Sequence, residues 1–82
     1  MNIYFTYENK GEIVLKGYIC NVSFEFQAYN RVAWIHFPDS NQSFVLKETE
    51  LNHFCSFMPV RKAKWLIRKG FFYYIISIFA RA

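Results

Sequence analysis

The alternation of apolar and polar residues between positions 22 and 46 predicts three short strands joined by turns. Over residues 22–29 the apolar side chains recur at every second position, as expected for a strand with one buried and one wet face. The connection through Asn30 and Arg31 has the length of a two-residue hairpin loop, where Asn tolerates the left-handed backbone. A longer polar turn, residues 38–42, precedes the last of these strands.

Two further strands are expected nearer the N-terminus. Residues 2–7 (NIYFTY) are rich in β-branched and aromatic residues and end at a polar stretch that contains Gly11. Residues 12–19 (EIVLKGYI) predict the second strand, in which Gly17 indicates a bend, a bulge or the close approach of another backbone. Residues 47–54 instead favour one short helical turn.

The secondary structure of the last third of the chain allows two interpretations. Residues 61–69 (RKAKWLIRK) combine good helix formers with consecutive apolar positions, so helix and strand both stay open, and Gly70 would suit the end of a helix. Residues 71–79 (FFYYIISIF) are strand-like by composition, but both alternating faces are apolar. Such a strand needs cover on both sides, from the rest of the domain or from a second chain.

The segments WIHFPD and FVLKETEL, separated by a polar turn, follow a glycine-containing strand and a long alternating strand over residues 11–51. This order resembles the SH3-like small barrels of the Tudor and KOW type. The resemblance implies a small barrel that binds peptide or nucleic acid without catalysing a reaction. We therefore predict a mainly β fold, either a small SH3-like barrel or a strongly curved antiparallel sheet of five to six strands with one short helical turn.

Composition adds a division of charge to this picture. The chain has 82 residues, of which 54% are hydrophobic and 22% aromatic, enough for one domain with a modest core and against disorder. Residues 1–58 carry a net charge of −2, whereas residues 59–82 carry +6 and no acidic residue. The single domain 1–82 thus consists of an acidic to neutral β meander, 1–58, and a basic and apolar C-terminal segment, 59–82.

The basic segment is the first candidate binding site. Lys and Arg side chains neutralise phosphates and an exposed indole stacks on an unpaired base, a combination typical of sequence-tolerant binding to single-stranded nucleic acid. The alternative is a solvated basic face that only keeps the chain soluble. The candidate nucleic-acid-binding residues are Arg61, Lys62, Lys64, Trp65, Arg68, Lys69 and Tyr29.

The apolar segment 71–79 supports a function of another class. As an edge strand it could complete a partner's sheet or a homodimer, as in a phage- or plasmid-encoded inhibitor or small subunit. The candidate interface residues are Phe71, Tyr73, Ile75 and Phe79. A third use, adsorption to an anionic membrane surface, needs a clean apolar helical stripe, which the sequence does not display.

Metal binding and catalysis have weaker support. Cys20, His36, His53 and Cys55 lack the spacing of a zinc site, so we predict no metal and no cofactor. Cys55 lies near His53 without an evident third residue to orient the pair, and we predict that the protein is not an enzyme. Both cysteines are expected to be reduced and buried.

Two predictions remain, one for an aromatic cluster and one for the cellular location of the protein. Trp34 is expected to fill the centre of the core, although Trp34, Tyr29 and Phe37 could instead form an aromatic ligand-binding face. The sequence shows no secretory leader, and the longest uncharged apolar run, residues 71–80, is shorter than the roughly 20 residues that span a bilayer. We therefore expect a cytoplasmic protein with no transmembrane segment.

Overall fold

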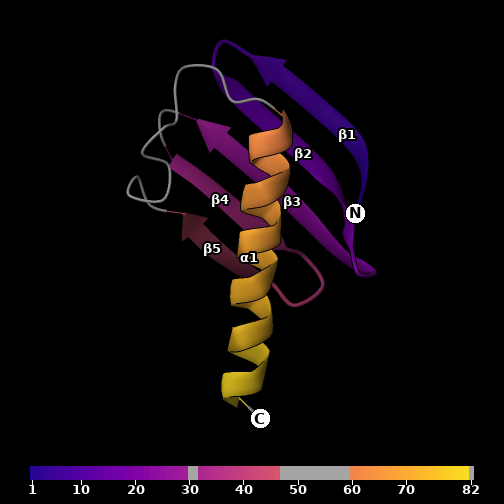
Figure 1. Cartoon of the computed structure of the whole chain (residues 1–82), viewed down its shortest axis with the longest axis vertical. Coiled ribbons are helices and arrows are strands. Elements are labelled where there is room, and N and C mark those ends of the chain that lie inside the picture. The colour runs from indigo at the N-terminus through magenta and orange to yellow at the C-terminus, as the bar shows by residue number, and fades with distance from the viewer. Residues whose placement is uncertain (30–31, 47–59, 82) are drawn as a thin grey trace.

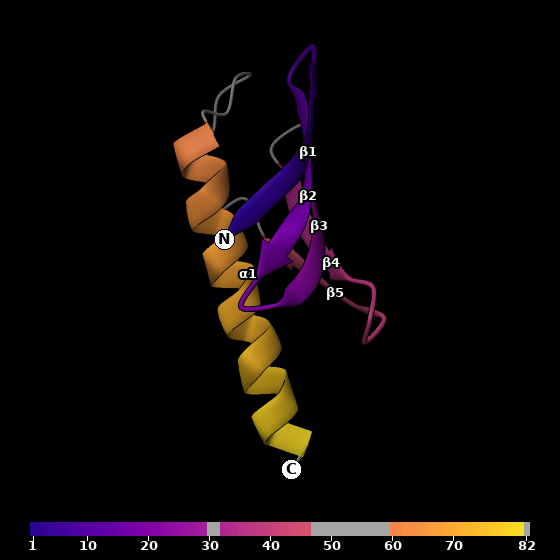
Figure 2. The same cartoon turned by 90° about the vertical axis from the view of Figure 1, so that its right-hand side faces the viewer.

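The computed structural model describes residues 1–29, 32–46 and 60–81, which form one sheet and one helix. The five strands pair antiparallel in the order β1-β2-β3-β4-β5, so β1 and β5 are the edges. Figures 1 and 2 show helix α1 lying across one face of this sheet as a second layer, with the other face uncovered by it. The elements are β1 (Asn2–Asn9), β2 (Glu12–Ile19), β3 (Val22–Tyr29), β4 (Val32–Phe37), β5 (Gln42–Leu46) and α1 (Val60–Arg81).

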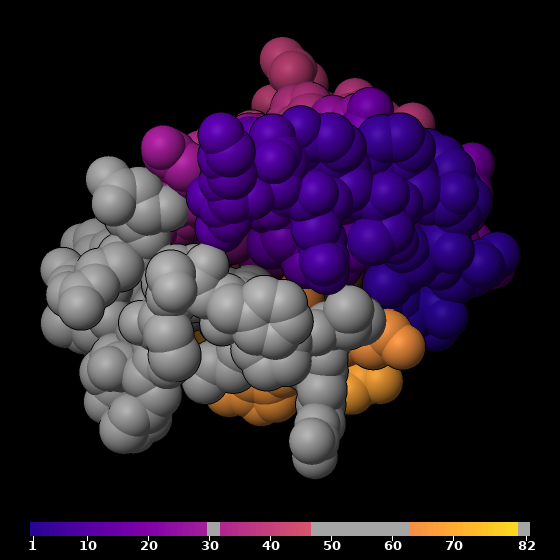
Figure 3. Space-filling model, turned by 90° about the horizontal axis from the view of Figure 1, so that it is seen from above, coloured from indigo at the N-terminus to yellow at the C-terminus, as the bar shows by residue number. Residues whose placement is uncertain are grey.

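The prediction of a mainly β fold with five antiparallel strands is confirmed. Among the described residues, β1 pairs with β2 and β5 pairs with β4, but the two edge strands do not pair with each other. The sheet is therefore open and not closed into a barrel. Seen from above in Figure 3, the indigo strands and the orange helix form two stacked layers. The short helical turn predicted at 47–54 and the loop at 30–31 lie outside the described residues.

Tight loops set the register of the first two hairpins. Lys10 and Gly11 join β1 to β2 with φ of 48° and 84°, and Cys20 and Asn21 join β2 to β3 with φ of 49° and 64°. Two successive left-handed residues match the type I′ turn, whose twist suits the flanking strands. The turn between β4 and β5 is closed by the Ser40 amide, which donates to the Phe37 carbonyl oxygen at 3.3 Å.

Gly17 has the role that the sequence predicts for it. A bulge interrupts the pairing of β1 with β2 between Ile3 and Phe5. At this place a Cβ atom on Gly17 would collide with the backbone of Asn2 and Ile3. The missing side chain therefore lets β1 cross closely over β2.

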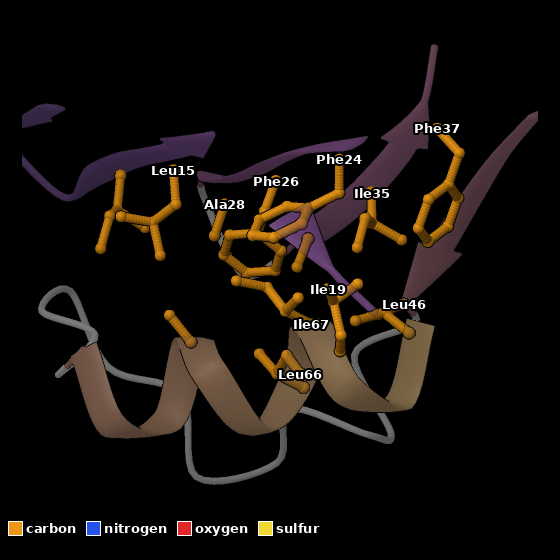
Figure 4. Close-up of a cluster of buried hydrophobic side chains, with 13 residues drawn as sticks. Leu15, Ile19, Phe24, Phe26, Ala28, Ile35, Phe37, Leu46, Leu66 and Ile67 are labelled. Atoms are coloured by element: carbon orange, nitrogen blue, oxygen red, sulfur yellow. The ribbon is translucent and has the colours of Figure 1, made fainter. Parts of the chain in front are cut away.

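The core lies between one face of the sheet and the inner face of α1. Figure 4 shows side chains from β2, β3, β4 and β5 pointing towards Leu66 and Ile67 of the helix. No polar or charged side chain of the described residues is buried. The buried set is Ile13, Leu15, Ile19, Phe24, Phe26, Ala28, Ala33, Ile35, Phe37, Leu46, Ala63, Leu66 and Ile67.

The prediction that residues 71–79 form a strand is wrong. They are the second half of α1, which is a helix of 22 residues that also includes 61–69. A helical period turns Phe71 and Tyr74 towards the sheet, where Tyr74 stacks on Phe37 with ring centroids 4.5 Å apart. A hydrogen bond from Gln42 Nε2 to Ser77 Oγ, 3.5 Å long, also connects β5 to this half of the helix.

Gly70 does not end the helix but lies buried within it. A Cβ atom placed on Gly70 would be 2.5 Å from Cγ2 of Ile35. The glycine therefore serves close packing of α1 against β4, which the sequence pattern alone does not distinguish from a helix end.

Candidate binding surfaces

The face of α1 that is turned away from the sheet carries a line of exposed large apolar residues. Trp65, Phe72, Ile76 and Phe79 follow each other at separations of seven, four and three residues, so they share one side of the helix. Their exposed fractions are 48%, 61%, 49% and 74%. We call these four residues the outer stripe. It extends over about 21 Å of the helix axis.

Basic side chains accompany the N-terminal part of the outer stripe. Lys64 and Arg68 are exposed, and the ammonium group of Lys69 lies 5.2 Å from the ring centroid of Trp65, in a cation–π contact. The sequence of α1 contains no acidic residue.

The structure brings together part of the predicted nucleic-acid site. Lys64, Trp65, Arg68 and Lys69 lie within two turns of each other on α1. Tyr29 does not join them. Its neighbour Ala28 is buried in the core, so the exposed ring of Tyr29 belongs to the opposite face of the sheet. Two further predicted residues lie in the first turn of α1, Arg61 and Lys62, but their side chains lie outside the described part of the chain.

The predicted protein interface changes its members because the segment is helical. Phe71 and Tyr73 pack against the core and Ile75 is half-buried, which leaves Phe79 as the exposed member of the predicted set. Phe72 and Ile76 are exposed in their place. The helical period of 3.6 residues identifies Phe72 and Ile76 as exposed, whereas the strand period of two residues does not.

The face of the sheet opposite α1, called the open face here, carries a polar row across the strands. The ammonium group of Lys16 lies 5.2 Å from the ring centroid of Phe5 and 3.9 Å from Oε2 of Glu25. Farther along the row, His36 Nδ1 and Ser43 Oγ share a hydrogen bond of 2.7 Å. The strand register places these five residues side by side, each opposite the next.

A shallow hollow of about 450 Å³ lies over this row. Trp34 lines it and is half-buried, so the prediction that Trp34 fills the core is wrong. Phe37, by contrast, is fully buried on the α1 side, which separates it from Trp34 and Tyr29. The other lining residues are Val14, Lys16, Glu25, Phe26, Gln27, His36 and Ser43.

The polar side chains of the open face are paired with one another. A serine and a histidine in contact need a third group that orients the imidazole. Glu25 stands opposite His36 in the register, but its carboxylate pairs with Lys16. The nearby amide of Gln27 likewise donates to Glu12 Oε2, at 2.8 Å. These polar groups therefore engage each other across the strands.

The remaining candidate ligands do not assemble in the described residues. Within 1–29, 32–46 and 60–81, no three His, Cys, Asp or Glu side chains come close enough to hold a metal ion. Cys20 is exposed in its hairpin loop, so the prediction that it is buried is wrong. His53 and Cys55 lie outside the described residues. No helix in the described part of the chain has the length and apolar character needed to cross a membrane.

No protein-family model matches the chain, and no curated protein and no solved structure matches it either.

Proposed function

We propose that the protein is a non-enzymatic binding module that inserts the outer face of α1 into an apolar groove of a partner protein. One observation supports this most directly. Phe72, Ile76 and Phe79 are exposed at positions i, i+4 and i+7 of the same helix. This is the spacing with which an amphipathic helix fills a hydrophobic groove.

The composition of α1 also describes the partner. Burying one large apolar side chain contributes about 1.5–3 kcal/mol, and association itself costs about 4–15 kcal/mol, so three anchors alone give modest affinity. Lys64 and Arg68 extend the contact at the N-terminal end of the outer stripe. A groove with an apolar floor and acidic residues at one end complements this pattern.

Capture of partners by the tagged full chain tests the proposal. Replacement of the apolar anchors by Phe72→Ser, Ile76→Ser and Phe79→Ser should abolish recovery of a protein that the unmodified chain retains after nuclease treatment. The matched control is Val32→Ser with Val45→Ser, which removes exposed apolar groups from the open face instead. Equal recovery by the triple variant would contradict the proposal.

Fluorescence then locates the contact on the purified pair. The Trp34→Phe variant keeps Trp65 as its single tryptophan, which belongs to the outer stripe, and Trp65→Phe keeps Trp34 on the open face. Binding should change the emission of the first variant and leave that of the second unchanged. The reverse result would assign the contact to the open face.

Single-stranded nucleic acid is the second candidate partner. The observation in its favour is the grouping of Lys64, Arg68 and Lys69 around the exposed indole of Trp65, on a helix without acidic residues. Phosphates would contact the cations and a base would stack on Trp65 or Phe72. This use involves the basic half of the helix and leaves Ile76 and Phe79 without a role.

Titration of the Trp34→Phe protein with oligothymidylate separates the two candidates. Nucleic-acid binding predicts saturable quenching that weakens steeply with salt, is lost with Lys64→Ala and Arg68→Ala, and survives Ile76→Ser with Phe79→Ser. Absence of quenching at low salt would remove this candidate. Binding to anionic phosphatidylserine vesicles that requires both sets of residues would instead assign the outer face to a membrane surface and contradict both candidates.

A further inference from the structure

The first strand is an exposed edge with little protection against pairing. β1 has eight residues, and of these Ile3 alone is half-buried. Natural edge strands carry lysine, proline or bulges that hinder the addition of another strand. β1 has one bulge near its beginning, and its pairing with β2 is regular from Phe5 onwards, with neither lysine nor proline in that stretch. Figure 1 shows β1 at the outer margin of the sheet.

From Phe5 onwards, after the bulge, the side chains of β1 alternate between the two faces of the sheet. Phe5 stands opposite Lys16 and therefore lies on the open face with the polar row. Thr6 stands opposite the buried Leu15, on the side of α1. Tyr7 returns to the open face, and Tyr7 and Phe5 are each 43% exposed.

The same stretch is self-complementary about Thr6. In an antiparallel pairing of two β1 strands centred on this residue, Phe5 lies opposite the partner's Tyr7 and Thr6 lies opposite the partner's Thr6. Aromatic–aromatic and Thr–Thr pairs are among the favourable cross-strand pairs. Glu8 falls opposite the partner's bulge at Tyr4, where the pairing is irregular, so no like charges meet.

We propose that β1 pairs with β1 of a second copy of the chain, which joins two sheets into one antiparallel sheet of ten strands. The two-fold axis runs perpendicular to the sheet at Thr6, so each contact away from the axis occurs twice, as in an isologous interface. Both α1 helices then lie on one side of the joined sheet. This dimer goes beyond the function proposed above, because it presents two outer stripes together and adds avidity for a partner with two grooves.

Light scattering after size-exclusion chromatography of the full chain, from about 1 µM to about 1 mM, tests this pairing. The unmodified chain should form a dimer at the higher concentrations. Thr6→Lys and Thr6→Glu should each elute as monomers, because each places two like charges opposite one another at the axis. Mixing these two variants in equal amounts should restore a mixed dimer.

Control variants separate this contact from α1. Val45→Lys adds the same charge to an exposed position at the other edge of the sheet, and it should remain dimeric, as should the triple serine variant of α1. A monomer at every concentration, a dimer that survives Thr6→Lys, or a dimer lost in the triple serine variant would each overturn the proposal.

Hydrogen exchange of the unmodified chain provides a test that does not depend on folding of the variants. Amide groups of residues 5–9 that point away from β2 should exchange more slowly as the concentration rises, because they become hydrogen-bonded in the dimer. Exchange at these amides that does not change with concentration would overturn the pairing.

Discussion

The inner and outer faces of α1 have similar chemistry but opposite environments. Leu66 and Ile67 on the inner face are fully buried against the sheet, whereas Phe72 and Ile76 on the outer face are 61% and 49% exposed. All four side chains are large and apolar, and all belong to one uninterrupted helix. Hydrophobicity therefore indicates that a surface is suited to burial, but not what covers it. Here the sheet covers the inner face, and a partner is proposed for the outer face.

The largest expected effect comes from the inner face. Leu66→Ala should reduce the free energy of unfolding by about 2–5 kcal/mol, because it leaves a cavity between α1 and the sheet. Urea unfolding followed by circular dichroism measures this loss. The matched control, Ile76→Ala on the outer face, should cost no more than about 0.5 kcal/mol. Equal losses in the two variants would contradict the distinction between the faces.

A smaller effect is expected where the helix comes closest to β4. Gly70→Ala should destabilise the chain by up to about 2 kcal/mol, since overpacking against Ile35 costs about 1–3 kcal/mol and the gain in helix propensity returns about 1 kcal/mol. A double-mutant cycle with Ile35→Ala should show coupling, because the shorter side chain removes the obstacle. Additive losses would mean that the two residues do not contact each other.

The smallest effect on stability is expected at the end of the outer stripe. Phe79→Ser should change the free energy of unfolding by no more than about 0.5 kcal/mol, because the ring is 74% exposed. Thermal unfolding by calorimetry measures it. A loss above about 1 kcal/mol would show that Phe79 packs against the rest of the isolated chain, and that the outer stripe ends before it.

The central strands were predictable because each of them has one buried and one less buried face. Alternation over residues 22–29 predicts β3, and the segment 12–19 was likewise predicted as the strand β2; both have the bounds that the structure shows. Alternation could not identify residues 71–79, because a segment that is apolar on every side fits the period of a strand and the period of a helix equally well. Gly70 added to the error, since a buried helix contact and a helix end both favour glycine.

The candidate site was predictable in composition but not in arrangement. Lys64, Trp65 and Arg68 are neighbours in sequence, so any local structure keeps them close. Tyr29 is separated from them by the thickness of the sheet, and the sequence does not state which face of the sheet the helix covers. Trp34 illustrates the same limit, because large size suggests the core while its place in the alternation assigns it to the open face.

Nuclear magnetic resonance of the labelled full chain with a soluble paramagnetic probe tests the central claim most directly. Chemical shifts should be helical throughout residues 60–81, the methyl groups of Ile76 should relax strongly with the probe, and those of Leu66 and Ile67 should stay protected. Extended shifts over residues 71–79, or equal protection of Ile76 and Ile67, would contradict a helix that keeps its outer face for a partner.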